Sequence, residues 1–192
     1  MAQFTAKMQH SPETIEKLAE ARQRTFQFGK RIAHSLIAIL LIVYGIYGSK
    51  QMYTPYIALI IGCTMITGLN AGIKRQAKAV IRQMGNNFPK SDYTFNENGF
   101  SFYHKGEIIP YSKLCRLIED KKYLYLYIST QSAYMVDKST VSGGTYTALK
   151  DFISAKSGLV WSRPNSIFNF SFTGLTDKFK NSKREYQGPR LK

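Results

Sequence analysis

Few side chains in this sequence have the type and spacing that catalysis requires. Glu119 and Asp120 form an acid pair, but two lysines follow at once, a composition typical of a solvated turn. Cys115 and His104 are a nucleophile and a base in principle, yet nothing in the sequence brings them together. We expect Cys115 to lie in a core strand instead. The sequence therefore predicts no catalytic residue and a protein that is not an enzyme.

Sites for phosphate, metal or cofactor are also not indicated. Residues 142–144 (Ser-Gly-Gly) precede a predicted helix, but they lack the Lys-Ser/Thr pair that completes a P-loop. A plain loop and helix cap is the favoured interpretation. The three histidines, His10, His34 and His104, are scattered and no Cys stands at ligand spacing. We expect no bound metal, no cofactor and no disulfide between the two cysteines.

Positive charge is the most conspicuous chemical property of the chain. Its 192 residues carry a formal net charge of +15. Such a balance favours nucleic acid or an anionic lipid surface as the partner. A candidate anion- or lipid-binding face comprises Lys113, Arg116, Lys121 and Lys122, with Lys105 nearby in sequence. The alternative is a generally basic surface, because no aromatic–basic motif specifies a ligand.

Two apolar runs, residues 32–47 and 52–69, decide between these partners. Neither contains Asp, Glu, Lys or Arg, and four residues separate them. A helix needs roughly 20 residues to cross the hydrocarbon core, a length that the flanking residues supply. The sequence predicts a transmembrane hairpin over residues 32–72 and makes nucleic acid an improbable partner. A buried helical hairpin in a soluble core is the alternative; a cleaved signal peptide fits less well.

Flanking charges predict the orientation of this hairpin. Eight cations lie on the side shared by the termini, against Lys50 alone in the turn: Arg22, Arg24, Lys30, Arg31, Lys74, Arg75, Lys78 and Arg82. The positive-inside rule places both termini in the cytoplasm of a multi-pass plasma-membrane protein. Four tyrosines at the opposite end suit the headgroup layer: Tyr44, Tyr47, Tyr53 and Tyr56.

The segments that flank the hairpin have their own patterns. In residues 1–31 we expect a strand over 2–9, where apolar and polar residues alternate, and then a lead-in helix capped by Ser11. That helix is interpreted as solvated; the alternatives are that it lies on the membrane or on the soluble domain. Residues 73–90 are predicted to form a basic juxtamembrane helix and a linker.

A compact cytoplasmic domain is predicted over residues 91–158. Short runs rich in Tyr, Phe, Ile and Leu alternate with turn residues, and indicate about five antiparallel strands in a small barrel or strongly bent sheet. One of these strands is expected over residues 111–119. A helix over 145–157 should pack Tyr146, Leu149, Phe152 and Ile153 against the sheet. The fold class is thus a membrane α-helical hairpin plus an α+β domain.

The remaining residues, 159–192, form a basic tail for which a flexible state is favoured. An alternative is an interfacial helix, because four apolar residues step by 4, 3 and 4: Phe168, Phe172, Leu175 and Phe179.

Four segments combine aromatic and turn residues in a recognisable pattern: residues 93–100 (YTFNENGF), 109–114 (IPYSKL), 123–127 (YLYLY) and 135–138 (MVDK). Together they resemble the YcxB-like family of bacterial membrane proteins. The resemblance covers roughly residues 94–152 in detail, and the hairpin in its organisation. It implies two spans and a C-terminal cytoplasmic domain with a PH-like antiparallel sheet or barrel and one C-terminal helix. It implies no activity and no site residues. In such a domain, residues 2–9 would add a strand to the sheet.

These observations favour a non-enzymatic, membrane-anchored interaction or regulatory module. Its expected partners are the anionic inner leaflet and another membrane protein or a second copy of itself. An accessory subunit of a membrane transport or envelope complex is the main alternative, with Gly62 and Gly68 offering small contact surfaces. A membrane enzyme and a DNA-binding protein are less favoured.

Overall fold

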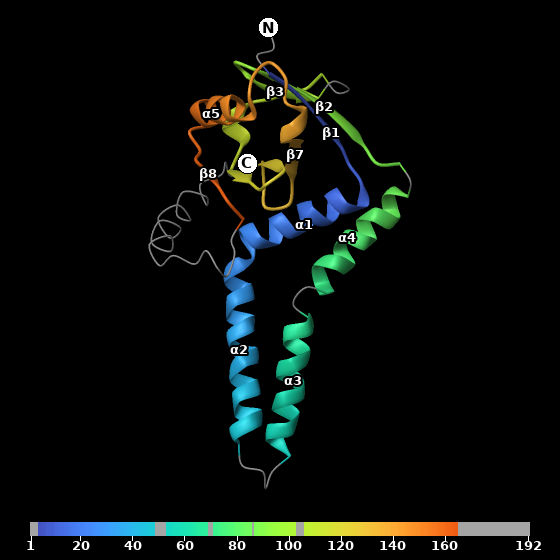
Figure 1. Ribbon diagram of the computed structural model, residues 1–192, viewed down its shortest axis with the longest axis vertical. Coiled ribbons are helices and arrows are strands. Elements are labelled where there is room, and N and C mark those ends of the chain that lie inside the picture. Colours follow the sequence, from blue (N-terminus) through green and yellow to red (C-terminus); the bar gives the residue numbers. More distant parts are fainter. Residues whose placement is uncertain (1–3, 49–52, 69–70, 86, 103–105, 165–192) are drawn as a thin grey trace, which may run out of the picture. The chain divides into compact units, whose positions relative to one another are not determined.

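A computed structural model describes residues 4–48, 53–68, 71–85, 87–102 and 106–164 of the chain (Figure 1). The chain divides into two compact units. A helical unit comprises residues 9–89, and a mixed unit comprises residues 1–8 and 90–192. The helical unit is therefore an insertion between the first and second strands of the mixed unit. The predicted tail-anchor residues, Phe168, Phe172, Leu175 and Phe179, lie outside the described residues.

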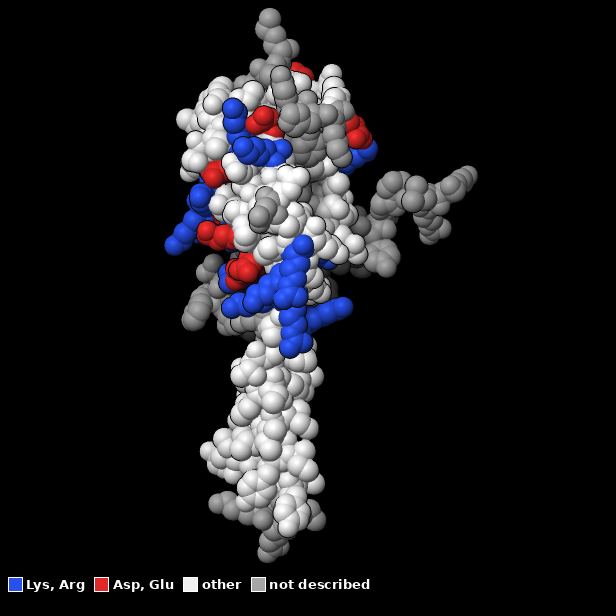
Figure 2. All heavy atoms as spheres, turned by 90° about the vertical axis from the view of Figure 1, so that its right-hand side faces the viewer, with Lys and Arg blue, Asp and Glu red and all other residues white. Residues whose placement is uncertain are grey.

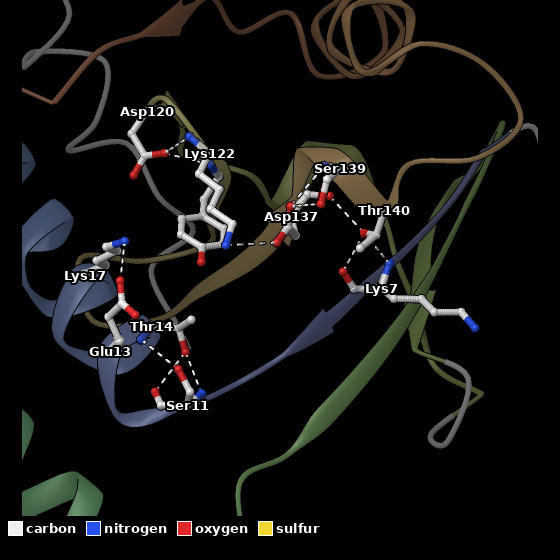
Figure 3. Close-up of polar contacts among 11 residues, drawn as sticks. Lys7, Ser11, Glu13, Thr14, Lys17, Asp120, Lys122, Asp137, Ser139 and Thr140 are labelled. Carbon is white, nitrogen blue, oxygen red and sulfur yellow. Dashed lines mark hydrogen bonds and ion pairs between the residues drawn. The ribbon is translucent and has the colours of Figure 1, made fainter.

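Four helices form the helical unit: α1 (Pro12–Phe26), α2 (Phe28–Tyr47), α3 (Thr54–Gly68) and α4 (Ala71–Met84). The predicted cap is confirmed, because the Ser11 hydroxyl accepts a hydrogen bond from the Thr14 N–H at 3.3 Å (Figure 3). The Thr14 hydroxyl in turn accepts from the Ser11 N–H at 2.7 Å, which completes a capping box. Gly85, with φ of +57°, follows the end of α4 as predicted.

The helices of this unit pack in two pairs. α2 lies along α3, and α1 packs against α4. Figure 1 shows α2 and α3 side by side as a long hairpin. The apolar run that was expected to reach residue 72 ends its helix at Gly68, and the basic helix begins at Ala71.

The first sheet of the mixed unit has the strand order β1-β2-β3-β4. Its strands are β1 (Phe4–Gln9), β2 (Lys90–Asn96), β3 (Gly99–Phe102) and β4 (Ile108–Ile109). β2 and β3 form a hairpin in which Asn96 pairs with Gly99 across a two-residue turn. A Cβ on Gly99 would lie 2.3 Å from the Ile109 carbonyl oxygen, so this close approach of β4 requires glycine.

β1 confirms the prediction that the start of the chain joins the sheet, from Phe4 onward. Ala6 and Met8 are buried, whereas Thr5 and Lys7 are exposed, as the alternating pattern requires. The outer edge of β1 is bonded by the segment before α5 (Tyr146–Ser157). Thr140 Oγ1 accepts from the Lys7 N–H at 2.9 Å and lies 2.7 Å from the Lys7 carbonyl oxygen (Figure 3).

The second sheet has the order β7-β6-β5-β8. Its strands are β5 (Arg116–Glu119), β6 (Tyr123–Tyr127), β7 (Ala133–Asp137) and β8 (Trp161–Ser162). β8 pairs with β5 in parallel, with Leu117 opposite Trp161. The predicted domain boundary at residue 158 is therefore wrong, because β8 belongs to the sheet. Two-residue strands show no alternation from which a sequence could predict them.

The core lies around β6 and α5. Every residue of β6 is buried, so both its leucine face and its tyrosine face are covered. From α5, Leu149 and Ile153 are fully buried, as predicted. Tyr146 was expected on the same side but is 42% exposed, since it occupies the first position of the helix.

One predicted strand is only partly correct. Within residues 111–119, Tyr111–Lys113 forms a 3-10 turn and the strand begins at Arg116. Pro110 lies at the cap of that turn, and the Tyr111 hydroxyl donates to the Asn96 carbonyl oxygen at 3.0 Å. A buried tyrosine with a long-range partner thus determines the backbone here.

Candidate membrane interface

Small residues form the contact between α2 and α3. Ala38 has no exposed surface, and Gly62 is buried. A Cβ on Gly62 would lie 2.8 Å from the Ala38 carbonyl oxygen and 2.8 Å from Ile42 Cγ1. The absence of that atom allows the two backbones to approach closely. Gly62 was expected to offer a surface to a partner, but the hairpin itself uses it; a Cβ on Gly68 would meet nothing within 4 Å.

Large apolar residues cover the outside of the same hairpin. Fourteen are between 42% and 85% exposed: Leu36, Ile37, Ile39, Leu40, Val43, Tyr44, Ile46, Tyr47, Tyr53, Tyr56, Ile57, Ile60, Ile61 and Ile66. Water-soluble helices show the opposite arrangement, with apolar side chains inside and polar ones outside. Single exposed apolar residues are ordinary, but a continuous surface of this extent indicates contact with another apolar phase.

Of the helices in the described part of the chain, α2 is long and apolar enough to cross a membrane. It has 20 residues and a mean hydropathy of 1.5 in its most apolar window. At 1.5 Å per residue it extends about 30 Å, the thickness of the hydrocarbon core. α3 is equally apolar in character but has 15 residues, or about 23 Å.

Cations gather at the end of the hairpin where α1 and α4 lie. Arg22 and Arg24 are on α1, Lys30 and Arg31 begin α2, and the remaining four lie on α4: Lys74, Arg75, Lys78 and Arg82. Figure 2 shows the blue spheres of α4 next to the uncharged surface of the hairpin. Arg24 pairs with Glu20 at 2.5 Å, and Arg31 Nη1 donates to Gln23 Oε1 at 3.3 Å.

The four cations of the predicted anion-binding face form two groups. Lys113 and Arg116 lie at one end of β5, where Arg116 pairs with Tyr127. Lys121 and Lys122 lie in the turn at the other end, and the four-residue strand separates the groups by about 10 Å. Lys122 approaches Asp137 at 3.9 Å and covers the ring of Tyr123. Lys105 lies outside the described residues.

Glu119 was expected in a solvated turn, and this expectation is wrong. Its carboxylate is 21% exposed and binds two lysines from other elements. Lys138 Nζ donates to Glu119 Oε1 at 2.6 Å, and Lys150 Nζ donates to Glu119 Oε2. Burial raises the pKa of Glu119, but the hydrogen bonds and charges of the two lysines outweigh it and hold that pKa below its ordinary value.

The lysines of this Glu119 cluster also stack on aromatic rings. Lys138 Nζ lies 5.0 Å from the ring centre of Tyr146, and Lys150 Nζ lies 5.8 Å from that of Trp161. The Trp161 Nε1–H donates to the Lys150 carbonyl oxygen at 3.0 Å, so the cluster links β5, α5 and β8. These partners are 19 to 42 residues from Glu119 in sequence, a separation at which no motif could have indicated them.

Cys115 and residues 142–144, which the sequence offered for chemistry, have structural roles. The Cys115 N–H donates to the Tyr127 carbonyl oxygen at 2.8 Å, just before β5 rather than within it; His104 lies outside the described residues. Ser142 pairs with Thr5 of β1 through both backbone groups, at 3.0 and 2.8 Å. The Thr145 hydroxyl caps α5 by accepting from the Ala148 N–H at 3.1 Å. The loop-and-cap interpretation is therefore confirmed.

A comparison with known protein families finds one family to which part of this chain is similar. Residues 95–153 match the family model described as YcxB-like protein. The mixed unit thus contains a segment similar to the YcxB-like family, and we call this unit the YcxB-like domain. The match begins in β2 and ends in α5, in agreement with the resemblance found in the sequence, and leaves β1 and β8 of this YcxB-like domain outside it. No curated protein and no solved structure matches the chain.

Proposed function

We propose that this protein is a non-enzymatic, membrane-anchored interaction or regulatory module. The α2–α3 hairpin crosses the plasma membrane twice, both termini are cytoplasmic, and the YcxB-like domain is presented at the inner leaflet. The observation that carries this proposal is the reversed polarity of the hairpin, with small residues inside and large apolar residues outside.

The distribution of charge supports the proposed orientation. Eight cations flank the two open ends of the hairpin, and Lys50 alone lies in the connecting turn. An anionic cytoplasmic leaflet attracts each nearby cation by about 1 kcal/mol. α3 is shorter than α2, and a locally thinner bilayer accommodates such a span at modest cost. Exposed Tyr44, Tyr47, Tyr53 and Tyr56 would then occupy the outer headgroup layer.

The connection between the units supports a presenting role. Two chain segments, rather than one, join the helical unit to the domain, because β1 precedes the insertion and β2 follows it. Those segments lie side by side: the His10 N–H donates to the Pro89 carbonyl oxygen at 3.1 Å. A doubly tethered domain has a high effective concentration toward membrane partners. Two four-stranded sheets and one helix, which follows seven of the eight strands in sequence, also favour the PH-like architecture that the resemblance implies.

Single-cysteine labelling of the full-length protein tests the topology. In a chain with Cys63 and Cys115 replaced by Ser, we expect Ser49→Cys to react with a membrane-impermeant maleimide in intact cells. Ser112→Cys, on the exposed surface of the domain, should react only after lysis. Labelling of position 112 in intact cells, or release of the protein by alkaline carbonate, would overturn the proposal.

Exchanging the hairpin separates the module from the main alternative, an accessory subunit of a transport or envelope complex. An unrelated two-span hairpin with the same flanking cations should keep the domain's native cross-linked partners if the domain is the interacting part. Loss of those partners would show instead that α2 and α3 bind them.

A further inference from the structure

A small polar pocket opens on the surface of the helical unit, among α1, α4 and the junction between α1 and α2. Its volume is about 170 Å³. Six residues line it: Ala19, Arg22, Gln23, Gln27, Gly72 and Gln76. The lining therefore combines one cation with three side-chain amides and includes no carboxylate.

The polar side chains that line this pocket, which we call the Arg22 cavity, offer more N–H donors than acceptor oxygens. Within the described parts of the chain, Arg22, Gln27 and Gln76 make no side-chain hydrogen bond or ion pair. Gln23 uses its oxygen to accept from Arg31 Nη1, which leaves its amide N–H groups available. Glu20, the adjacent acid on α1, is paired with Arg24. Unpaired donors around one guanidinium are complementary to an anion with several oxygens.

The position of the cavity at the end of the hairpin indicates which kind of anion it would bind. Gln27 is the residue between α1 and α2, and Gly72 is the second residue of α4. The first apolar run begins five residues after Gln27, and the second ends three residues before Gly72. The cavity is also smaller than the roughly 300–1,000 Å³ typical of sites that enclose a whole organic ligand. It suits a headgroup whose apolar chains remain outside, along the apolar surface of α2 and α3.

We propose that the Arg22 cavity binds the phosphate of an anionic phospholipid headgroup. This proposal rests on the membrane anchoring proposed above and adds a specific lipid site to it. Arg22 supplies the charge-assisted hydrogen bonds, and Gln23, Gln27 and Gln76 donate to the remaining oxygens.

Two substitutions and two matched controls isolate the site. Arg22→Gln removes the charge from the cavity, and Arg75→Gln removes the same charge from an exposed position of α4 outside it. Gly72→Leu fills the cavity without removing any polar group, since a Cβ there meets nothing within 4 Å. Gly29→Leu makes the same change at a glycine of α2 that is equally open but does not line the cavity.

Retention of phosphatidylglycerol by the full-length protein in a neutral detergent, measured by native mass spectrometry, is the test. We expect the wild type to retain phosphatidylglycerol in preference to phosphatidylcholine. Arg22→Gln should weaken retention by roughly 10- to 100-fold, the value of a charge-assisted hydrogen bond. Gly72→Leu should weaken it as well, because the leucine side chain occupies the space proposed for the phosphate. Arg75→Gln and Gly29→Leu should change it by less than about 5-fold.

Each contrary result has a defined meaning. Equal retention by the wild type and Arg22→Gln would overturn the proposed site. Displacement of phosphatidylglycerol by millimolar inorganic phosphate would identify a free phosphate, not a lipid, as the ligand. Circular dichroism and membrane fractionation of all variants accompany the measurement. A protein that integrates into membranes but shows no lipid preference refutes only this site, whereas failure to integrate refutes the proposed function.

Discussion

Replacing Glu119 by Gln tests whether the Glu119 cluster stabilises the YcxB-like domain. The substitution keeps the shape of the side chain and removes its charge. In the native domain the carboxylate accepts from both Lys138 and Lys150, whose side chains are 13% and 19% exposed. Glu119→Gln leaves two ammonium groups with little access to water and without their counter-charge.

The expected loss follows from these contacts. A hydrogen bond to a charged group contributes about 1.5–3 kcal/mol, and an unpaired charge in a protected position costs more than one at the surface. The glutamine oxygen still accepts one bond, so we expect a net loss of about 2 kcal/mol. In a domain of this size that corresponds to a fall in melting temperature of roughly 10 °C.

Trp161 makes the assay specific. It is the only tryptophan in the sequence, and its ring lies beside Lys150 in the same cluster. Its fluorescence during thermal or urea unfolding of the full-length protein in detergent therefore reports on this domain. Glu97→Gln is the matched control, because Glu97 is 55% exposed and pairs with Lys156 at the surface. That change should cost less than about 1 kcal/mol.

The pH dependence of the domain's stability provides the result that would refute this reasoning about Glu119. Because the folded domain holds the pKa of Glu119 below its ordinary value, the charged cluster stabilises the fold above the unfolded pKa of about 4.3. This stabilisation is lost as the pH falls through the folded pKa. The wild type and Glu119→Gln should therefore differ at pH 7 and converge under acid conditions. Equal stability of the two at pH 7 would refute the reasoning.

Three further predictions concern β1 and the hairpin. Thr140→Val removes the hydroxyl that bonds Lys7 and should destabilise the domain by about 1 kcal/mol in the same fluorescence assay, whereas Thr130→Val, at an exposed turn, should not. Deleting residues 2–9 removes β1 and should lower the domain's melting temperature further; an unchanged melting curve would contradict the observed pairing. Gly62→Leu forces a side chain against the α2 backbone and should destabilise the hairpin by at least about 1–3 kcal/mol. Gly68→Leu has free space and should be neutral. Thermal unfolding of both variants in detergent, monitored by circular dichroism, measures the difference.

Local sequence patterns were sufficient to predict the elements whose apolar and polar residues, caps or turn residues follow a regular spacing. The alternation over residues 2–9 predicted β1, and Ser11 with Pro12 predicted the start of α1. The two apolar runs predicted α2 and α3, and the turn residues located the β2–β3 hairpin. In each case the deciding interaction is made within a few residues or with the surrounding solvent.

Features that depend on distant partners could not be predicted in the same way. β8 forms because Trp161 meets β5, 44 residues earlier in its register, and no periodicity exists in two residues. Glu119 and its two lysines come from three elements, so their spacing in sequence carries no signal. The Arg22 cavity likewise requires α1 and α4 to pack together, although they are separated by the whole hairpin.

The insertion also explains how β1 reaches its place in the sheet. About 80 residues separate β1 from β2, and closing a flexible loop of that length carries an entropic cost that rises with the logarithm of length. The packed helices shorten this distance in the folded protein: α2 on α3 and α1 on α4 bring residues 10 and 89 within hydrogen-bonding distance. Pairing of β1 with β2 then closes a short gap instead of a long loop. The hairpin thus has a structural role in the YcxB-like domain in addition to its proposed role as an anchor.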